Sequence, residues 1–113
     1  YWGKHEKASQ MRLHIGPAAE VLESLKRPWD LVFLDADKIN LVHYYEQLLP
    51  QLRTGGIMLI DNILWSGKVV GGPHSNDKDT KAIKALNDHV AQDNRVEQVI
   101  LSVRDGIMMV RKL

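Results

Sequence analysis

The sequence predicts an α/β fold in which strands and helices alternate along one small domain. Two short apolar runs, 31–34 and 57–60, each end abruptly in an aspartate, Asp35 and Asp61. Continuous apolar runs bounded by charge are typical of strands buried on both faces of a parallel sheet. Apolar residues at helical spacing follow each run. This alternation predicts a parallel sheet wound in the right-handed sense.

The remaining elements follow from local patterns along the chain. We expect a strand over 11–15, a helix over 18–25, a strand over 31–34, a helix over 41–52 that Pro50 kinks or ends early, a turn at 54–56, a strand over 57–60, a glycine-containing loop over 61–72, a helix over 80–91 with Asp79 as its N-cap, and strands over 96–103 and 107–110. The Asp105-Gly106 pair favours a tight hairpin turn, so the last strand is expected to return antiparallel at the edge of the sheet.

Composition excludes several classes of protein. The chain has 113 residues, of which 44% are hydrophobic and 26% are charged, and these values are ordinary for a soluble globular domain. A formal net charge of +1 argues against nucleic acid or an acidic membrane surface as a partner. No apolar run approaches the roughly 20 residues that span a bilayer. The absence of cysteine excludes disulfide and thiolate chemistry and permits a reducing compartment, so a cytoplasmic location is expected.

Polar side chains follow the two apolar runs at the point where each strand is expected to end. Ligands bind beyond the carboxyl ends of strands in open α/β sheets. If the two strands are neighbours, Asp35, Asp61 and Asn62 converge at one edge of the sheet. Two carboxylates and an amide oxygen are hard ligands that suit Mg²⁺, and the same oxygens suit Mn²⁺.

Several motifs together resemble one family. They are Leu34-Asp35-Ala36-Asp37-Lys38, Gly55-Gly56, Ile60-Asp61-Asn62, Leu64-Trp65-Ser66-Gly67-Lys68-Val69, Gly16-Pro17-Ala18 and Asp105-Gly106. In this combination and order they resemble the cation-dependent O-methyltransferases of the caffeoyl-CoA and catechol type. The resemblance covers essentially the whole chain. It implies the C-terminal portion of a Rossmann-like class I methyltransferase fold, with parallel strands, helices and an antiparallel terminal hairpin.

The resemblance also implies a function. Such enzymes use S-adenosylmethionine and a divalent cation, Mg²⁺ or alternatively Mn²⁺ or Ca²⁺, to methylate one hydroxyl of a vicinal diol on an aromatic small molecule. By resemblance, the metal ligands are Asp35, Asp61 and Asn62, the general base is Lys38, the substrate-binding residues are Asp37, Trp65 and Ser66, and the cofactor-binding residues are Gly16, Pro17, Ala18 and Asp35. A homodimer is expected because the family commonly forms one.

One departure from the family pattern is visible. The glycine-rich turn that follows the first strand of such enzymes has no counterpart here, and the chain begins at Tyr1 rather than at a methionine. We therefore expect residues 1–113 to form a partial methyltransferase domain that lacks the N-terminal glycine-rich cofactor segment. Most of the S-adenosylmethionine site is then expected to be absent, and the strand at Leu31 is expected to have an unpaired edge.

Two other functions remain open at this point. The stretch from Asp30 to Asp35 also resembles the acceptor strand of a receiver-type phosphoacceptor domain. However, no earlier acidic pair and no later strand-end lysine accompany it. A truncated methyltransferase-like chain could instead be a non-enzymatic assembly module. Within the methyltransferase interpretation, the acceptor and the metal are not specified by the sequence.

Overall fold

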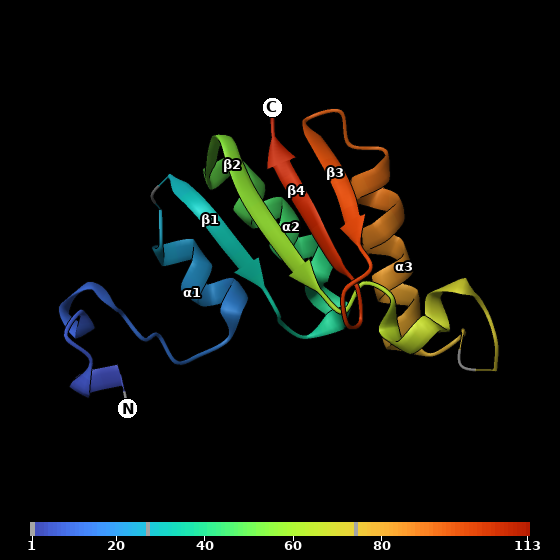
Figure 1. The fold of residues 1–113 in the computed structure, drawn as a ribbon, viewed down its shortest axis with the longest axis horizontal. Coiled ribbons are helices and arrows are strands. Elements are labelled where there is room, and N and C mark those ends of the chain that lie inside the picture. Colours follow the sequence, from blue (N-terminus) through green and yellow to red (C-terminus); the bar gives the residue numbers. More distant parts are fainter. Residues whose placement is uncertain (1, 27, 74) are drawn as a thin grey trace.

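A four-stranded sheet forms the centre of the computed structural model, which describes residues 2–26, 28–73 and 75–113. Its strands are β1 (Trp29–Leu34), β2 (Leu52–Asp61), β3 (Val96–Leu101) and β4 (Ile107–Lys112). They lie in the order β1-β2-β4-β3 (Figure 1). β1 and β2 are parallel, whereas β4 runs antiparallel to both of its neighbours. The sheet is therefore mixed, as the α/β prediction with a terminal hairpin required.

The position of the antiparallel strand differs from the prediction. β4 lies inside the sheet between β2 and β3, and β3 forms the edge. Met108 and Val110 of β4 are buried, whereas most of β3, including Glu97 and Gln98, is exposed. β4 thus takes the inner place, where its side chains Met108 and Val110 are removed from water.

The described residues also form three α-helices: α1 (Ala18–Ser24), α2 (Leu41–Leu48) and α3 (Lys78–Ala91). Short 3-10 turns complete the described elements: η1 (Trp2–Lys4), η2 (Ala8–Gln10), η3 (Lys38–Asn40), η4 (Leu49–Gln51) and η5 (Trp65–Val70). α2 and α3 lie behind the sheet in the view of Figure 1. Their apolar residues pack with one face of the strands in the core. Tyr44 and Tyr45 are buried, as expected for residues that pack α2 against the sheet.

Several predicted boundaries are wrong. Residues 11–15 form no strand, and Met11, Leu13 and Ile15 are exposed because no described strand pairs with them. The early end or kink that Pro50 predicted in the helix over 41–52 is confirmed: α2 ends at Leu48, and the chain continues as the 3-10 turn η4, which contains Pro50. Residues 54–56, expected as a turn, lie in β2, where the pairing with β1 shifts register.

The loop after β2 and the start of α3 also differ in detail. Residues 65–70 form the 3-10 turn η5 where a loop without secondary structure was expected. The residue before α3 is Asp77, and Asp79 lies in the first turn of the helix. A carboxylate there still faces the positive end of the helix dipole, so only the boundary changes.

The face of the sheet opposite α2 and α3 is uncovered by the described residues. Leu31 and Phe33 of β1 are 60% and 57% exposed, and Val99 of β3 is 51% exposed. In the register of the sheet, Phe33 is aligned with Leu59, Met109 and Val99, so one row of apolar side chains crosses all four strands. The expectation that β1 is buried on both faces is wrong for this chain, because the helices of the described residues lie on one face of the sheet.

Within the described part of the chain, no helix is both long enough and apolar enough to cross a bilayer.

Candidate functional site

The carboxyl ends of β1 and β2 meet at one edge of the sheet. Leu34 pairs with Ile60 in parallel register, so Asp35 and Asp61 are the next residues of two neighbouring strands. This is the arrangement that the two strand-end motifs predicted. Ligand sites in α/β sheets commonly lie at this edge.

Lys38 lies at the centre of this edge. It belongs to η3, and its Nζ atom is 3.6 Å from Oδ1 of Asp35 and donates a hydrogen bond of 3.2 Å to Oδ1 of Asn62. The ammonium group also lies 5.7 Å from the centroid of the Trp65 ring, within the range of a cation–π interaction. The Lys38 side chain is only 10% exposed. The structure thus brings together four of the residues singled out from the sequence.

The turn after β2 holds Asn62 in an unusual backbone conformation. Its φ of 62° lies in the left-handed region, which asparagine adopts more readily than most residues. Oδ1 of Asp61 accepts a 2.7 Å hydrogen bond from the Asn62 backbone N–H. The Asn62 side-chain amide donates at 3.2 Å to Oδ2 of Asp105. Asp61 and Asn62 are therefore held by contacts from the strand and from the distant hairpin.

The β3–β4 hairpin holds this turn. The backbone N–H of Ile63 donates to the carbonyl of Gly106 at 3.3 Å, and that of Leu64 to the carbonyl of Asp105 at 3.0 Å. A Cβ atom at Gly106 would lie 2.6 Å from Cγ of Leu64, so only glycine allows this approach. Gly106 also has a φ of 80°. The Asp-Gly pair predicted from the sequence as a turn thus also supports the site.

Ser66 contributes its backbone more clearly than its side chain. Its N–H donates a 2.6 Å hydrogen bond to Oδ1 of Asp105, and the residue is exposed. Sequence patterns assigned Asp105 only to the Asp-Gly turn. Its part in the site depends on a contact across 43 residues, which no local pattern reveals.

Asp37 is occupied by contacts within the chain. Its carboxylate accepts hydrogen bonds from the Tyr44 hydroxyl at 2.5 Å and from the Asn40 amide at 2.6 Å. The Tyr44 hydrogen bond lowers the pKa of Asp37, and the same bond raises the pKa of Tyr44. These contacts tie η3 to α2. The predicted contact of Asp37 with a substrate stays a prediction.

Three of the four predicted cofactor-binding residues line one cavity. A cavity of about 310 Å³ lies between α1, β1 and α2, and Gly16, Ala18 and Asp35 are among its lining residues. Pro17 precedes α1 and is exposed. The cavity reaches the candidate metal ligands through Asp35 and is otherwise lined mainly by apolar side chains. A mainly apolar cavity with a few polar groups is typical of small-molecule sites in proteins.

The residues at the edge of the sheet also suit a divalent cation. The predicted ligands offer two carboxylates and one amide oxygen, the donors that Mg²⁺ and Mn²⁺ prefer. The ammonium group of Lys38 lies near oxygens of Asp35 and Asn62, so two of the three predicted ligands face a positive charge in this conformation. The donor set therefore fits the predicted ion, and in this structure the cation that faces these oxygens is the ammonium group of Lys38.

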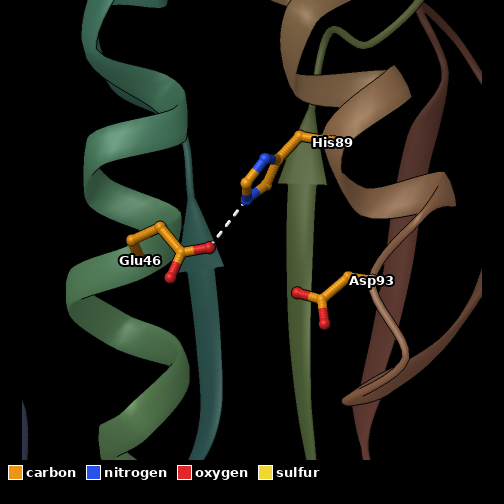
Figure 2. Close-up of side chains that lie close together, drawn as sticks. All are labelled: Glu46, His89 and Asp93. Carbon is orange, nitrogen blue, oxygen red and sulfur yellow. Dashed lines mark hydrogen bonds and ion pairs between the residues drawn. The ribbon is translucent and has the colours of Figure 1, made fainter.

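A second group of possible ligands lies elsewhere. Ligand atoms of Glu46, His89 and Asp93 lie within 4.8 Å of one another, and Nε2 of His89 is 2.6 Å from Oε1 of Glu46 (Figure 2). The sequence showed no metal-ligand spacing for any histidine, because these residues come from α2, α3 and the turn after α3. Proximity alone does not make this group a metal site.

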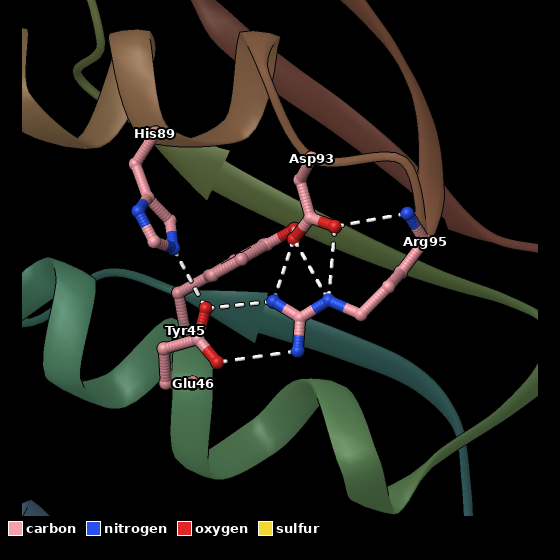
Figure 3. A network of polar contacts seen from close by, with 5 residues as sticks. All are labelled: Tyr45, Glu46, His89, Asp93 and Arg95. Carbon is pink, nitrogen blue, oxygen red and sulfur yellow. Dashed lines mark hydrogen bonds and ion pairs between the residues drawn. The ribbon is translucent and has the colours of Figure 1, made fainter.

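Arg95 binds the two carboxylates of this second group. Its guanidinium donates to Oε1 of Glu46 and to Oδ2 of Asp93, each at 2.7 Å, and the Tyr45 hydroxyl donates to Asp93 at 2.8 Å (Figure 3). The Arg95 hydrogen bonds lower the pKa of both carboxyl groups, and burial raises the pKa of Tyr45. A guanidinium already neutralises the carboxylates, so we interpret the group as an ion-pair cluster that joins α2 to the turn before β3.

Residues 1–113 match a protein family described as O-methyltransferase. The chain belongs to this O-methyltransferase family. It is 37% identical over 118 residues to a protein of Dictyostelium discoideum named "Probable caffeoyl-CoA O-methyltransferase 1", a match that covers 100% of this chain and 51% of that protein. The family match favours the methyltransferase interpretation over the receiver-type alternative.

Solved structures agree with this O-methyltransferase assignment. An SAH-bound methyltransferase of Podospora anserina superposes with a TM-score of 0.76 at 28% identity, over 87% of this chain and 47% of that one. An O-methyltransferase of Bacillus cereus in complex with SAH superposes with a TM-score of 0.69 at 31% identity. This match covers 84% of this chain and 46% of that one. The chain thus has the mixed α/β sheet of class I methyltransferases, and it spans about half the length of the relatives that it matches.

Proposed function

We propose that this chain carries the metal-binding and acceptor-binding part of an S-adenosylmethionine-dependent O-methyltransferase. The proposed acceptor is a small aromatic molecule with two adjacent hydroxyl groups, of the catechol or caffeoyl kind. The single observation that supports it most is the convergence of Lys38, Asp35 and Asn62 at the edge of the sheet, in a chain that belongs to an O-methyltransferase family. The chain would correspond to the C-terminal half of the complete enzyme.

The chemistry requires a more reactive acceptor oxygen. A neutral phenol is a poor nucleophile near neutral pH, since its pKa lies near about 10. A divalent cation held by Asp35, Asp61 and Asn62 would make the hydroxyl more acidic and would orient the two adjacent oxygens. Asp61 lies at the end of β2, and Asn62 lies in the turn that the hairpin holds, so these two proposed ligands are positioned by the sheet and by the hairpin.

Lys38 is the proposed proton acceptor. Its Nζ atom lies near oxygens of Asp35 and Asn62, so a hydroxyl bound at these residues would be within its reach. The side chain is largely shielded from solvent, with the Trp65 ring on one side. An ammonium group has no lone pair, so in this role Lys38 must be a neutral amine when the acceptor is bound; Nζ then takes the proton of the hydroxyl, and Trp65 limits the access of water.

S-adenosylmethionine is the proposed methyl donor. The cavity that Gly16, Ala18 and Asp35 line is the proposed place for part of the cofactor. Its position beside the edge of the sheet would bring donor and acceptor close together, and such alignment supplies much of the rate in a displacement reaction. Two relatives with bound SAH support the cofactor class.

The proposal is tested by the ionisation of a bound diol. Caffeate is titrated with the protein and Mg²⁺ near neutral pH while the near-ultraviolet absorption is recorded, because ionisation of a phenol shifts its band to longer wavelength. We expect the shift with Mg²⁺, its loss with a chelator, and no shift for 4-coumarate, which has one hydroxyl. Asp61→Ala is expected to abolish the shift and Asp30→Asn, an exposed control, to retain it. An absorption shift that persists in the presence of the chelator, or equal shifts for caffeate and 4-coumarate, would contradict the proposal.

A further inference from the structure

The carboxylate of Asp105 contacts two groups of the turn after β2. Oδ2 accepts a hydrogen bond of 3.2 Å from the Asn62 side-chain amide, and Oδ1 accepts one of 2.6 Å from the Ser66 backbone N–H. Asp105 lies in the β3–β4 turn and is partly buried. Both of its oxygens are therefore engaged by the segment that carries Asn62, Trp65 and Ser66.

This contact determines which way the Asn62 amide points. An ionised carboxylate can only accept hydrogen bonds, so the NH₂ group of Asn62 must face Asp105. The oxygen of the same amide must then point the other way, and it does, toward Nζ of Lys38 at 3.2 Å. Turned around, the amide would direct its NH₂ group at an ammonium group and its oxygen at a carboxylate. Both contacts would be repulsive.

We propose that Asp105 is a positioning residue that holds the Asn62 amide with its oxygen toward the metal position. The inference rests on the proposed function, because it assigns Asp105 an effect on a cation that Asp35, Asp61 and Asn62 are proposed to bind. Residues that hold metal ligands through hydrogen bonds typically change affinity by about 10–100-fold when they are altered. Asp105 acts through Asn62 and does not touch the ion.

Asp105→Asn separates this role from support of the fold. The backbone hydrogen bonds from Ile63 and Leu64 to the hairpin do not involve the changed side chain. The new amide keeps one oxygen for the Ser66 N–H, so its NH₂ group then faces Asn62. That arrangement favours the turned Asn62 amide, with the NH₂ group at the metal position.

The experiment is a titration of the 113-residue chain with Mn²⁺, in which electron paramagnetic resonance measures the free ion. The variants are Asp105→Asn, Asp61→Ala as a test of the metal site, and Asp30→Asn as a remote control with the same change of charge. Each titration is made at low and at high salt, because salt screens a loss of charge but leaves the orientation of an amide unchanged. Thermal unfolding is recorded for every variant.

For Asp105→Asn we expect about tenfold weaker Mn²⁺ binding at both salt concentrations, with thermal unfolding close to that of the original chain. Affinity within twofold of the original, while Asp61→Ala abolishes binding, would overturn the inference and leave the metal site standing. A loss that disappears at high salt would also overturn it, since charge alone would then explain the effect. Unchanged binding in Asp61→Ala would contradict the metal site and the inference with it.

A reciprocal exchange tests the same idea if Asp105→Asn impairs folding. In Asn62→Asp combined with Asp105→Asn, the amide at position 105 donates to a carboxylate at position 62, and the number of charges in the pair is unchanged. Every orientation of the new carboxylate presents an oxygen to the metal. We expect Mn²⁺ affinity at least equal to that of the original chain. An affinity as low as that of Asp105→Asn alone would overturn the inference.

Discussion

Lys38 and Asn62 are joined across the edge of the sheet by a 3.2 Å hydrogen bond from Nζ to Oδ1. One residue comes from the 3-10 turn after β1 and the other from the turn after β2, so the contact connects the two motifs that follow these strands. It also places a proposed general base beside a proposed metal ligand. The chemistry of the site can therefore be tested at Lys38 without altering any proposed ligand.

The first prediction concerns proton transfer. In the complete enzyme of which this chain is proposed to form the C-terminal half, Lys38→Met and Lys38→Arg should each lower kcat for methyl transfer by about 100-fold or more, in the range expected for loss of a general base. Arginine keeps the positive charge but does not release a proton in proteins, so it should not rescue turnover. Steady-state kinetics, with Mn²⁺ binding as the control, make the comparison. Near-normal turnover in Lys38→Arg would show that Lys38 contributes charge and not proton transfer.

The second prediction concerns the ion-pair cluster of Glu46, His89, Asp93 and Arg95. Arg95→Met should lower the free energy of unfolding by about 1–2 kcal/mol, because the nearly buried Asp93 carboxylate then keeps only weaker donors. Half of the Arg95 side chain is exposed, which limits the loss. The control is Arg53→Met, whose ion pair with Asp30 is more exposed and should contribute little. Urea unfolding of both variants provides the test, and equal losses would refute this role for Arg95.

Stability should also depend on pH through the same cluster. The hydrogen bonds from Arg95 hold the pKa values of Asp93 and Glu46 below their ordinary values of 3.8 and 4.5. The unfolded chain therefore takes up protons first as the pH falls, and this favours unfolding. The stabilisation is complete above about pH 5 and is lost progressively at lower pH. Urea unfolding between pH 3 and pH 7 should show this decline, and Arg95→Met should show a shallower one.

The exposed side of the sheet predicts self-association of the isolated chain. β1 is one of the two outer strands, and Leu31 and Phe33 present apolar surface beside its unpaired edge. Sedimentation should show association that increases with concentration, and Leu31→Lys should reduce it. Val103→Lys adds the same charge at another exposed apolar residue and should change association less. A clean monomer with a cooperative melt would contradict this prediction and, with it, the expected oligomer.

Local patterns in the sequence predicted the parts of the fold that depend on short segments. Strand-end residues such as Asp35 and Asp61 follow apolar runs that can be read directly, and their neighbouring positions were predicted correctly. The alternation at 11–15 was misleading, because a strand needs a partner and the described chain offers none there. The exposure of Phe33 could not be foreseen for a similar reason, since it depends on which face the helices cover.

Contacts between residues far apart in the sequence could not be predicted from local patterns. Asp105 reaches Asn62 across 43 residues, and Arg95 reaches Glu46 across 49. Each is an ordinary polar residue in a turn or at a strand start when only its neighbours in sequence are considered. Their roles depend on the hairpin packing against the turn after β2 and on α3 packing beside α2, which only the three-dimensional arrangement reveals.

The most direct test of the proposed function uses the complete enzyme of which this chain is proposed to form the C-terminal half. It measures the transfer of a labelled methyl group from S-adenosylmethionine to an aromatic vicinal diol, with and without a chelator. Transfer should stop when the divalent cation is removed, resume when Mg²⁺ is added, and be absent in Asp61→Ala. That variant should keep its cooperative thermal unfolding, because Asp61 lies at a strand end outside the core. Transfer that continues without a divalent cation, or at an unchanged rate in Asp61→Ala, would contradict the proposed site.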